Sequence, residues 1–321
     1  VAITVEAANI LTLSMIVFGQ GESRCHPYVL KEMLGAAHPD RSAALRAFDD
    51  ALFRHVGFTL SNLARAFVLG LTGARLARVP QAAVGTPYLK QLTRLSSGFA
   101  FMADVAMLSH GGDLKRREKL SGRFADILSH LYLASAVIKH HEDADRLVAE
   151  QPIVEWALQD SLYKIQQAML GICENFPVKA VGRIMRIAVM PLGPRIKPPS
   201  DRLGHRVAQV LMQPGEARDR LSSGLYFELD RNDPVGLTEL CLRKVIAAEP
   251  IEQKLREATG VAIAPYEFDA AITKGLEQGV INDLEARTVR EAMELTSAVI
   301  AVDEFGEHRQ QLEGTQPAAS A

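Results

Sequence analysis

Apolar residues recur every three or four positions over most of the 321-residue chain, the spacing that places side chains on one face of an α-helix. Two such stripes run through residues 120–138 and 158–176. A third consists of Leu45, Phe48, Leu52, Val56, Leu60, Leu63, Phe67 and Leu71. No segment of similar length alternates with a period of two, so strands should be rare. We therefore predict an all-α fold, a long-helix bundle followed by a smaller helical unit with little or no β-sheet.

Prolines and glycines divide this helical pattern into parts. Four prolines fall within residues 190–200, which predicts a Pro-rich linker at 191–200 between a bundle at 36–190 and a small helical unit at 201–305. Residues 306–321 hold few anchoring apolar side chains, and we expect a disordered tail there. Within the second unit, Pro250 suits the first turn of a helix, and Asn282 or Asp283 suits the cap of the last helix.

Composition excludes several classes of protein. Lys and Arg number 36 and Asp and Glu 38, and the resulting net charge of -2 argues against a dedicated nucleic-acid binder. Three dispersed cysteines without a CxxC pair give neither a disulfide framework nor a zinc signature, and they favour a reducing compartment. No stretch reaches the roughly 18 to 20 apolar residues of a membrane span.

Glu6 is the candidate for chemistry in the opening segment. It lies in a turn of small residues directly before the strongly apolar stretch 10–17. Partial desolvation there would raise the pKa of the carboxyl group and make it a stronger base. The same position also suits a first-turn glutamate that is only favoured by the helix dipole. The spacing alone leaves both interpretations open and favours the second.

Blocks of sequence along the whole chain, in order, carry a family resemblance. They are VEAANILT (5–12), FGQG (18–21), RCHPYVLKE (24–32), ADVAML (103–108), GGDLKRRE (111–118), LSHLYLASA (128–136) and AVIAVDEF (298–305). In these blocks the chain resembles bacterial fatty acyl-CoA dehydrogenases of the large, C-terminally extended type. The resemblance assigns residues 1–35 to the last helix of the core bundle and residues 36–190 to a helical extension of it.

This resemblance implies an activity, the α,β-dehydrogenation of fatty acyl-CoA to trans-2-enoyl-CoA in fatty-acid β-oxidation. In the family a glutamate removes the α-proton while FAD takes the β-hydride, and Glu6 stands at the matching place. The surrounding turn departs from the family pattern Tyr-Glu-Gly-Thr, because Val5, Ala7 and Ala8 replace its other three residues. Ala7 adopts positive φ less easily than Gly, and Ala8 offers no hydroxyl.

The resemblance also bears on cofactor and partners. The family builds its FAD and acyl-CoA pockets mostly from domains that precede the glutamate turn, and only five residues precede Glu6 here. We therefore expect the chain to be a C-terminal portion that is inactive alone and binds FAD weakly or not at all. Electron-transfer flavoprotein is the implied electron acceptor, and an oligomer is the implied state of the intact enzyme.

Three further groups of side chains are candidates for a functional site, but each is a weaker candidate than Glu6. Cys25 and His26 are adjacent, but a nucleophile and its base need proximity in space. The run 140–143 (His-His-Glu-Asp) fans around a helix end, so we predict no metal site there. Asp104 lies in an apolar segment, and we expect an ion pair with Arg94 or Lys115 to satisfy it.

A basic helix at residues 179–190 leaves another alternative open. Lys179, Arg183 and Arg186 follow one another at spacings of four and three, as in helices that lie on anionic membranes. Packing against the bundle is the interpretation that we prefer. The competing functions are thus a dehydrogenase portion, a non-catalytic all-α interaction module, and a membrane-surface module. We expect a cytoplasmic protein, with peripheral contact to the inner membrane if the helix binds lipid.

Overall fold

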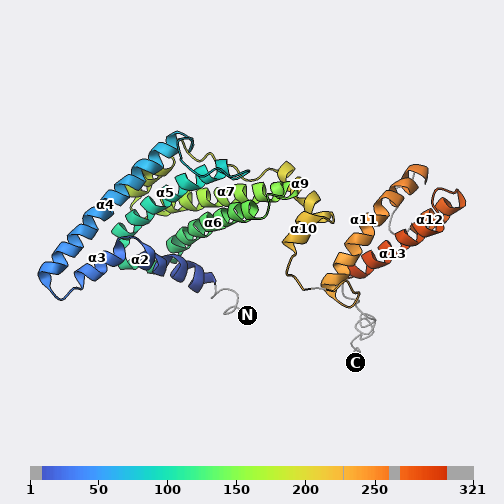
Figure 1. Ribbon diagram of the computed structural model, residues 1–321, viewed down its shortest axis with the longest axis horizontal. Helices are drawn as coiled ribbons and strands as arrows, with labels where there is room; N and C mark the ends of the chain where they lie inside the picture. The colour runs from blue at the N-terminus through green and yellow to red at the C-terminus, as the bar shows by residue number, and fades with distance from the viewer. Residues whose placement is uncertain (1–8, 227, 260–267, 302–321) are drawn as a thin grey trace, which may run out of the picture. The chain divides into compact units, whose positions relative to one another are not determined.

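The computed structural model describes residues 9–226, 228–259 and 268–301 (Figure 1). Every regular element within these ranges is a helix, which confirms the predicted all-α class. The chain divides into two compact units, Val1–Ala208 and Gln209–Ala321. Glu6 and the predicted tail at 306–321 lie outside the described residues. None of the described helices is long and apolar enough to cross a membrane.

The first unit is a bundle of long helices joined by short turns. Its elements are the π-helix η1 (Asn9–Gln20), α2 (Gly21–Cys25), α3 (Val29–Ala36), α4 (Arg41–Leu71), α5 (Thr86–His110), the 3-10 helix η2 (Gly111–Arg116), α6 (Glu118–Asp143), the 3-10 helix η3 (Val148–Glu150), α7 (Gln151–Asn175), α8 (Lys179–Val189) and the first part of α9 (Asp201–Met212). Helix α6 packs along both α7 and η1, and α4 packs along α5 and α3.

Helices α6 and α7 bury the two stripes that the sequence places on them. In α7 the side chains of Leu158, Ile165, Met169 and Ile172 are completely buried. Phe124 of α6 joins them in one continuous core. Each such side chain stabilises the fold by about 1.5–3 kcal/mol relative to leaving it in water. The stripes at 120–138 and 158–176 are therefore the core-facing sides of their helices.

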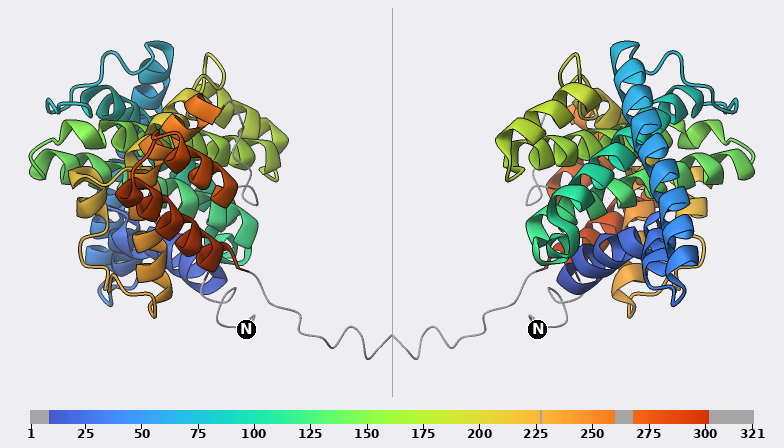
Figure 2. Two further views of the ribbon diagram at one scale, coloured as in Figure 1. Left: turned by 90° about the vertical axis from the view of Figure 1, so that its right-hand side faces the viewer. Right: turned by 90° about the vertical axis from the view of Figure 1, so that its left-hand side faces the viewer.

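The stripe from Leu45 to Leu71 behaves differently. Residues 41–71 form one helix, as predicted, but α4 turns a different face to the bundle. Its buried residues are mostly small: Ala51, Asn62, Ala66, Leu69 and Gly70. The right-hand view of Figure 2 shows α4 lying in front of the bundle. The apolar stripe of α4 is largely exposed, so α4 carries two apolar faces and the first unit buries only one.

Helix α8 and the segment that follows it lie against α7. Gly182 of α8 approaches so closely that a Cβ there would stand 2.2 Å from the carbonyl oxygen of Cys173. Residues 190–200 form no helix, and their backbone is fixed by Gln166 of α7. The Gln166 amide donates to the carbonyl oxygen of Ile196 and accepts from its N–H, both at 2.9 Å. The predicted linker segment is thus bonded to the first unit, and its role as a domain boundary stays a prediction.

The second unit contains α10 (Glu216–Leu221), α11 (Pro234–Thr259), α12 (Phe268–Glu277) and α13 (Asp283–Ile300). Asn282 caps α13 through a capping box with Glu285, which confirms one of the two predicted caps. The prediction for Pro250 is wrong, because α11 begins sixteen residues earlier and runs through it. Ala248, Ile251 and Leu255 around this proline are buried in the core of the unit, and this tertiary packing stabilises a helix that proline alone would interrupt.

A partly buried ion pair joins α10 to α11. The Arg218 guanidinium donates to both carboxylate oxygens of Glu239, and Arg243 donates to one of them. These bonds, with that from Arg218 the largest cause, lower the pKa of Glu239 from 4.5 to about 2. Because the folded-state pKa is the lower one, the pair stabilises the unit at neutral pH. The contribution is lost as the pH falls from about 4.5 towards 2.

Gly182→Ala tests the close approach of α8 to α7. The new methyl group would overlap a backbone carbonyl that cannot move away without shifting a helix. We expect the free energy of unfolding to fall by about 2 kcal/mol or more. Gly204→Ala in α9 is the matched control, because nothing lies within 4 Å of its Cβ position. It should raise stability by about 0.5–1 kcal/mol. Urea denaturation followed by circular dichroism measures both, and equal stability of the two variants would contradict the packing described.

Candidate functional site

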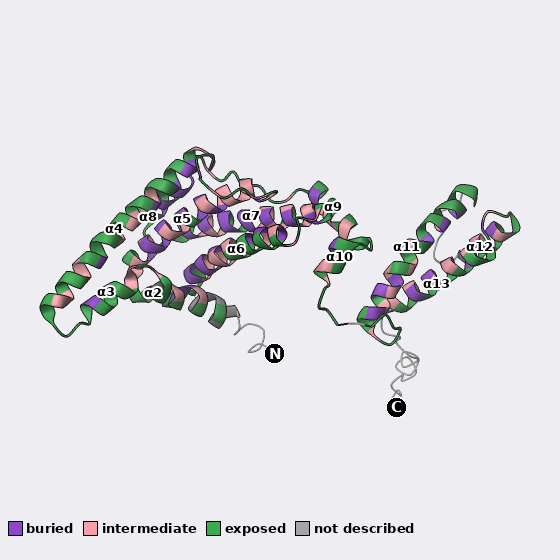
Figure 3. Cartoon of the chain, in the orientation of Figure 1, coloured by how far each residue is buried: buried purple, intermediate pink, exposed green. Residues whose placement is uncertain are grey.

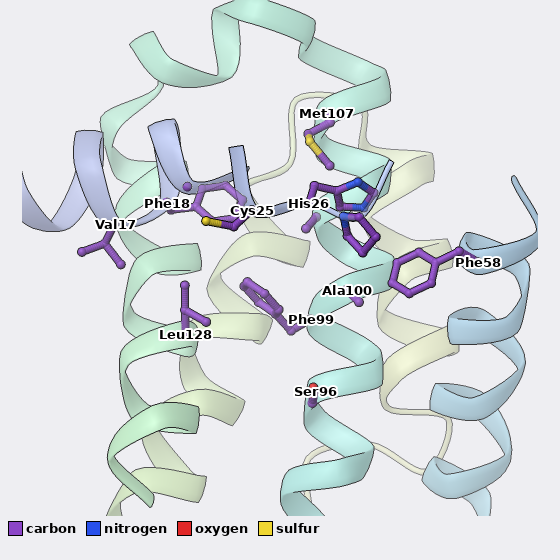
Figure 4. A pocket seen from close by; sticks show the side chains of 13 residues that line it. Val17, Phe18, Cys25, His26, Phe58, Ser96, Phe99, Ala100, Met107 and Leu128 are labelled. Carbon is purple, nitrogen blue, oxygen red and sulfur yellow. The ribbon is translucent and has the colours of Figure 1, made fainter. Parts of the chain in front are cut away.

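An apolar pocket of about 350 Å³ opens among η1, α4, α5 and α6 of the first unit (Figure 4). Its volume lies at the lower end of the range of small-molecule sites. Cys25, His26 and Ser96 are the polar residues of its lining. The other lining residues are Val17, Phe18, Gly21, Pro27, Phe58, Phe99, Ala100, Ala103, Met107 and Leu128.

Aromatic rings form one wall of this pocket and hold η1 in place. The ring of Phe18 stacks on Phe124 with centroids 4.6 Å apart and meets Phe99 edge-on at 6.1 Å. Phe18 is 3% exposed, so η1 is anchored in the core by a large side chain near its C-terminal end. A helix of π type is rare in proteins, and short π-helical turns occur often at functional sites.

His26 borders the pocket, and both of its ring nitrogens are engaged. The Nδ1 atom accepts hydrogen bonds from the backbone N–H groups of Tyr28 and Val29, at 3.3 and 3.2 Å. The Nε2 atom lies 3.0 Å from Oδ1 of Asp104. These partners assign the proton to Nε2, which donates to the carboxylate. His26 therefore holds the turn before α3 and has no free nitrogen to act as a base.

Asp104 of α5 is the buried centre of a group of hydrogen-bonded side chains, called the polar cluster below: His26, Glu32, His55, Thr59 and Asp104. Besides His26, the Thr59 hydroxyl donates to its Oδ2 at 2.6 Å, and Nε2 of His55 lies 3.4 Å from its Oδ1. The Nδ1 atom of His55 in turn lies 2.8 Å from Oε1 of Glu32. The cluster thus joins the turn before α3, α3 itself, α4 and α5 through one carboxylate.

The expected partners of Asp104 were wrong, although a buried partner is present. Arg94 lies on the same helix but donates to Gln91 and to the carbonyl oxygen of Val189. Lys115 is exposed in η2. The sequence did not indicate His26 or His55, because both are far from Asp104 along the chain. The signal that could have found them is the requirement that a buried carboxylate be paired.

His26, His55 and Asp104 are also a possible set of metal ligands, since their ligand atoms lie within 4.8 Å of one another. A metal at Nε2 of His26 needs a lone pair on that nitrogen, but the two backbone N–H bonds to Nδ1 keep the proton on Nε2. With this bonding, His26, His55 and Asp104 are better suited to link helices by hydrogen bonds than to bind a metal ion.

The two other groups considered from sequence do not assemble into sites. Cys25 is exposed at the pocket, and His26 beside it has no nitrogen free to activate the thiol. At 140–143 the side chains diverge, because His141 is buried while His140 and Asp143 are exposed. Elsewhere, burial raises the pKa of Cys173 to about 11, which leaves that thiol unreactive.

Helix α8 has both a face that packs against the bundle and an exposed basic face, the two that the sequence suggested. Gly182, Met185, Ala188 and Val189 pack against the bundle. The opposite side is exposed and carries cations interleaved with apolar side chains: Lys179, Arg183, Ile184, Arg186 and Ile187. No acidic residue occurs in α8. The helix therefore packs and, at the same time, offers a basic surface to solvent.

The pocket does not fit a flavin cofactor. Its lining contains no cation and no glycine-rich loop at a helix N-terminus for a pyrophosphate. His26 cannot donate into it, because its one N–H bonds to Asp104. Apolar walls of this kind suit a hydrocarbon group instead.

Comparison with known proteins gives one match over most of the chain. The sequence model of the family described as "Acyl-CoA dehydrogenase, C-terminal, bacterial type" matches residues 23–305. This range includes α3 to α13 and the whole polar cluster. No solved structure matches the chain.

Asp104→Ala tests whether the polar cluster stabilises the folded first unit. The change leaves the Nε2–H of His26 without its acceptor, and it removes the carboxylate partner of Thr59 and His55. We expect the free energy of unfolding to fall by about 3 kcal/mol. Asp113→Ala in η2 removes an exposed carboxylate and should change it by less than about 0.5 kcal/mol. Urea denaturation at pH 7 provides the comparison, and a loss at Asp104 no larger than at Asp113 would show that the cluster holds nothing together.

Proposed function

Because the chain belongs to the family of bacterial-type acyl-CoA dehydrogenase C-terminal regions, we propose that it is the C-terminal part of an FAD-dependent fatty acyl-CoA dehydrogenase. The reaction converts a fatty acyl-CoA into trans-2-enoyl-CoA, a step of fatty-acid β-oxidation. The observation that carries this proposal is the match over residues 23–305, which leaves only the two ends of the chain outside it.

Glu6 is the proposed base that removes the α-proton of the thioester. Such a proton is weakly acidic, so the carboxylate must be held in contact with the α-carbon. Two observations support the assignment: the resemblance of the segment 5–12 to the family's glutamate turn, and the anchoring of the following helix η1 by Phe18.

FAD, when bound, accepts the β-hydride. The pocket of the first unit does not fit it, so we propose that domains of the intact enzyme outside this chain hold it and that the chain alone is inactive. The same proposal includes an oligomeric enzyme and electron-transfer flavoprotein as the electron acceptor. The role left to the described residues is structural: they fix η1 and extend the helical bundle.

Peripheral membrane contact is a second element of the proposal, and the exposed face of α8 supports it. Arg183 and Arg186 can bind anionic headgroups, while Ile184 and Ile187, each 61% exposed, can enter the interface between headgroups and acyl chains. A cytoplasmic enzyme that acts on long acyl chains would meet its substrates at the inner membrane. The rival view, a purely non-catalytic module, gives Glu6 no chemical role.

Glu6→Gln in the intact enzyme tests the catalytic assignment. The substitution keeps size and hydrogen bonding and removes the base, so flavin reduction by acyl-CoA should slow by a factor of at least about 100. Binding of FAD and acyl-CoA should persist. Glu118→Gln, at the exposed start of α6, is the matched control and should react at the wild-type rate. Stopped-flow absorbance of the flavin measures both. A Glu6→Gln enzyme that reduces its flavin at the wild-type rate would refute the proposal.

Arg183→Glu combined with Arg186→Glu tests the membrane contact. Reversing both charges should abolish co-sedimentation of the chain with vesicles rich in phosphatidylglycerol, since each cation contributes about 1 kcal/mol near an anionic surface. Arg116→Glu combined with Arg117→Glu is the control, because it changes the net charge equally at another exposed site. Absence of vesicle binding by the wild-type chain, or an equal loss in both variants, would reject a role for α8.

A further inference from the structure

Helix α4 carries an apolar face that no described residue of the first unit covers. Eight large apolar side chains of α4 are between 38% and 74% exposed, and all of them but Val68 share one face: Leu45, Leu52, Phe53, Val56, Leu60, Phe67 and Leu71. At 100° per residue they fall within one sector about 100° wide. Figure 3 shows exposed residues along the length of α4. The stripe spans 27 residues, from Leu45 to Leu71, or about 39 Å.

The geometry of α4 separates this face from its contact with the bundle. The buried residues, such as Ala51, Asn62 and Ala66, lie on a neighbouring sector. Arg46, Asp50 and Arg54 lie on a third sector, and the last two form an i,i+4 ion pair at the surface. A contiguous apolar patch of this length is unusual on a monomer and marks an interaction site.

We propose that this face binds the same face of a second copy of the chain, with the two α4 helices antiparallel. The stripe is self-complementary when the helix is reversed about Phe58. Reversal sets Leu45 opposite Leu71 and Val56 opposite Leu60. It also sets Phe53 opposite Leu63, which is half-buried against the core of the first unit. A two-fold interface requires such a patch, because each surface must match itself.

The exposed area is sufficient for a dimer. Taking about 150–250 Å² for a large apolar side chain, the exposed fractions of the seven residues amount to roughly 600 Å² per copy, close to the ~800 Å² per partner of a standard interface. Asp49 is the only charged residue within the stripe. The reversal sets it opposite Phe67, towards one end of the interface, where the rim is solvated.

Two measurements of the purified chain test this proposal. In the first, light scattering after size exclusion at about 50 μM should give the mass of a dimer for the wild type. Phe53→Glu combined with Leu60→Glu should give the mass of a monomer with unchanged helical circular dichroism. Leu108→Glu combined with Tyr132→Glu is the control, since these residues of α5 and α6 are 90% and 74% exposed. It should remain a dimer.

The second measurement tests the orientation of the helices. In a Cys25→Ser background, Leu45→Cys combined with Leu71→Cys should form an intermolecular disulfide on mild oxidation, whereas each single substitution should not. The two positions are about 39 Å apart within one helix and cannot link internally. A wild-type monomer, a dimer that survives Phe53→Glu with Leu60→Glu, or cross-links from the single variants would overturn the antiparallel dimer. A wild-type monomer would leave the catalytic proposal intact, because the test involves neither FAD nor Glu6.

Discussion

The buried carboxylate of Asp104 is the constraint on which the arrangement of the first unit depends. A carboxyl group buried inside a protein needs polar partners, and this one is met by a histidine, a threonine and a second histidine from other parts of the chain. His26 in turn caps α3, and His55 binds Glu32. The cluster therefore fixes where α3 and α4 lie on α5, and the apolar pocket forms beside it.

Periodicity was enough to predict much of this fold. The stripes at 120–138 and 158–176 predicted both the helices and the faces that they bury, because apolar spacing and packing agree there. Periodicity did not predict the buried face of α4, because the apolar face and the buried face of that helix are different. A single chain shows which face of a helix is apolar, but not whether the partner for that face belongs to the same molecule. The prediction of a helix start at Pro250 was wrong because tertiary packing stabilises α11 on both sides of this proline.

The candidate site was harder to predict than the fold. Asp104 stood out in the sequence as a carboxylate in an apolar segment, but its partners lie 45, 49 and 78 positions away along the chain, and no local pattern links them. Cys25-His26 drew attention as adjacent reactive residues, whereas the structure uses His26 as a cap. Family resemblance, not spacing, pointed to Glu6, and that residue lies outside the described part of the chain.

The described helices, the match to bacterial-type acyl-CoA dehydrogenase C-terminal regions and the anchored η1 are consistent with our proposal that this chain supplies the base and that other domains of the intact enzyme supply the flavin. The most direct test is a structure of the intact enzyme with FAD and a bound acyl-CoA. The account predicts a carboxylate oxygen of Glu6 within about 3–3.5 Å of the thioester α-carbon. A Glu6 side chain directed into solvent, away from the acyl-CoA, would contradict it.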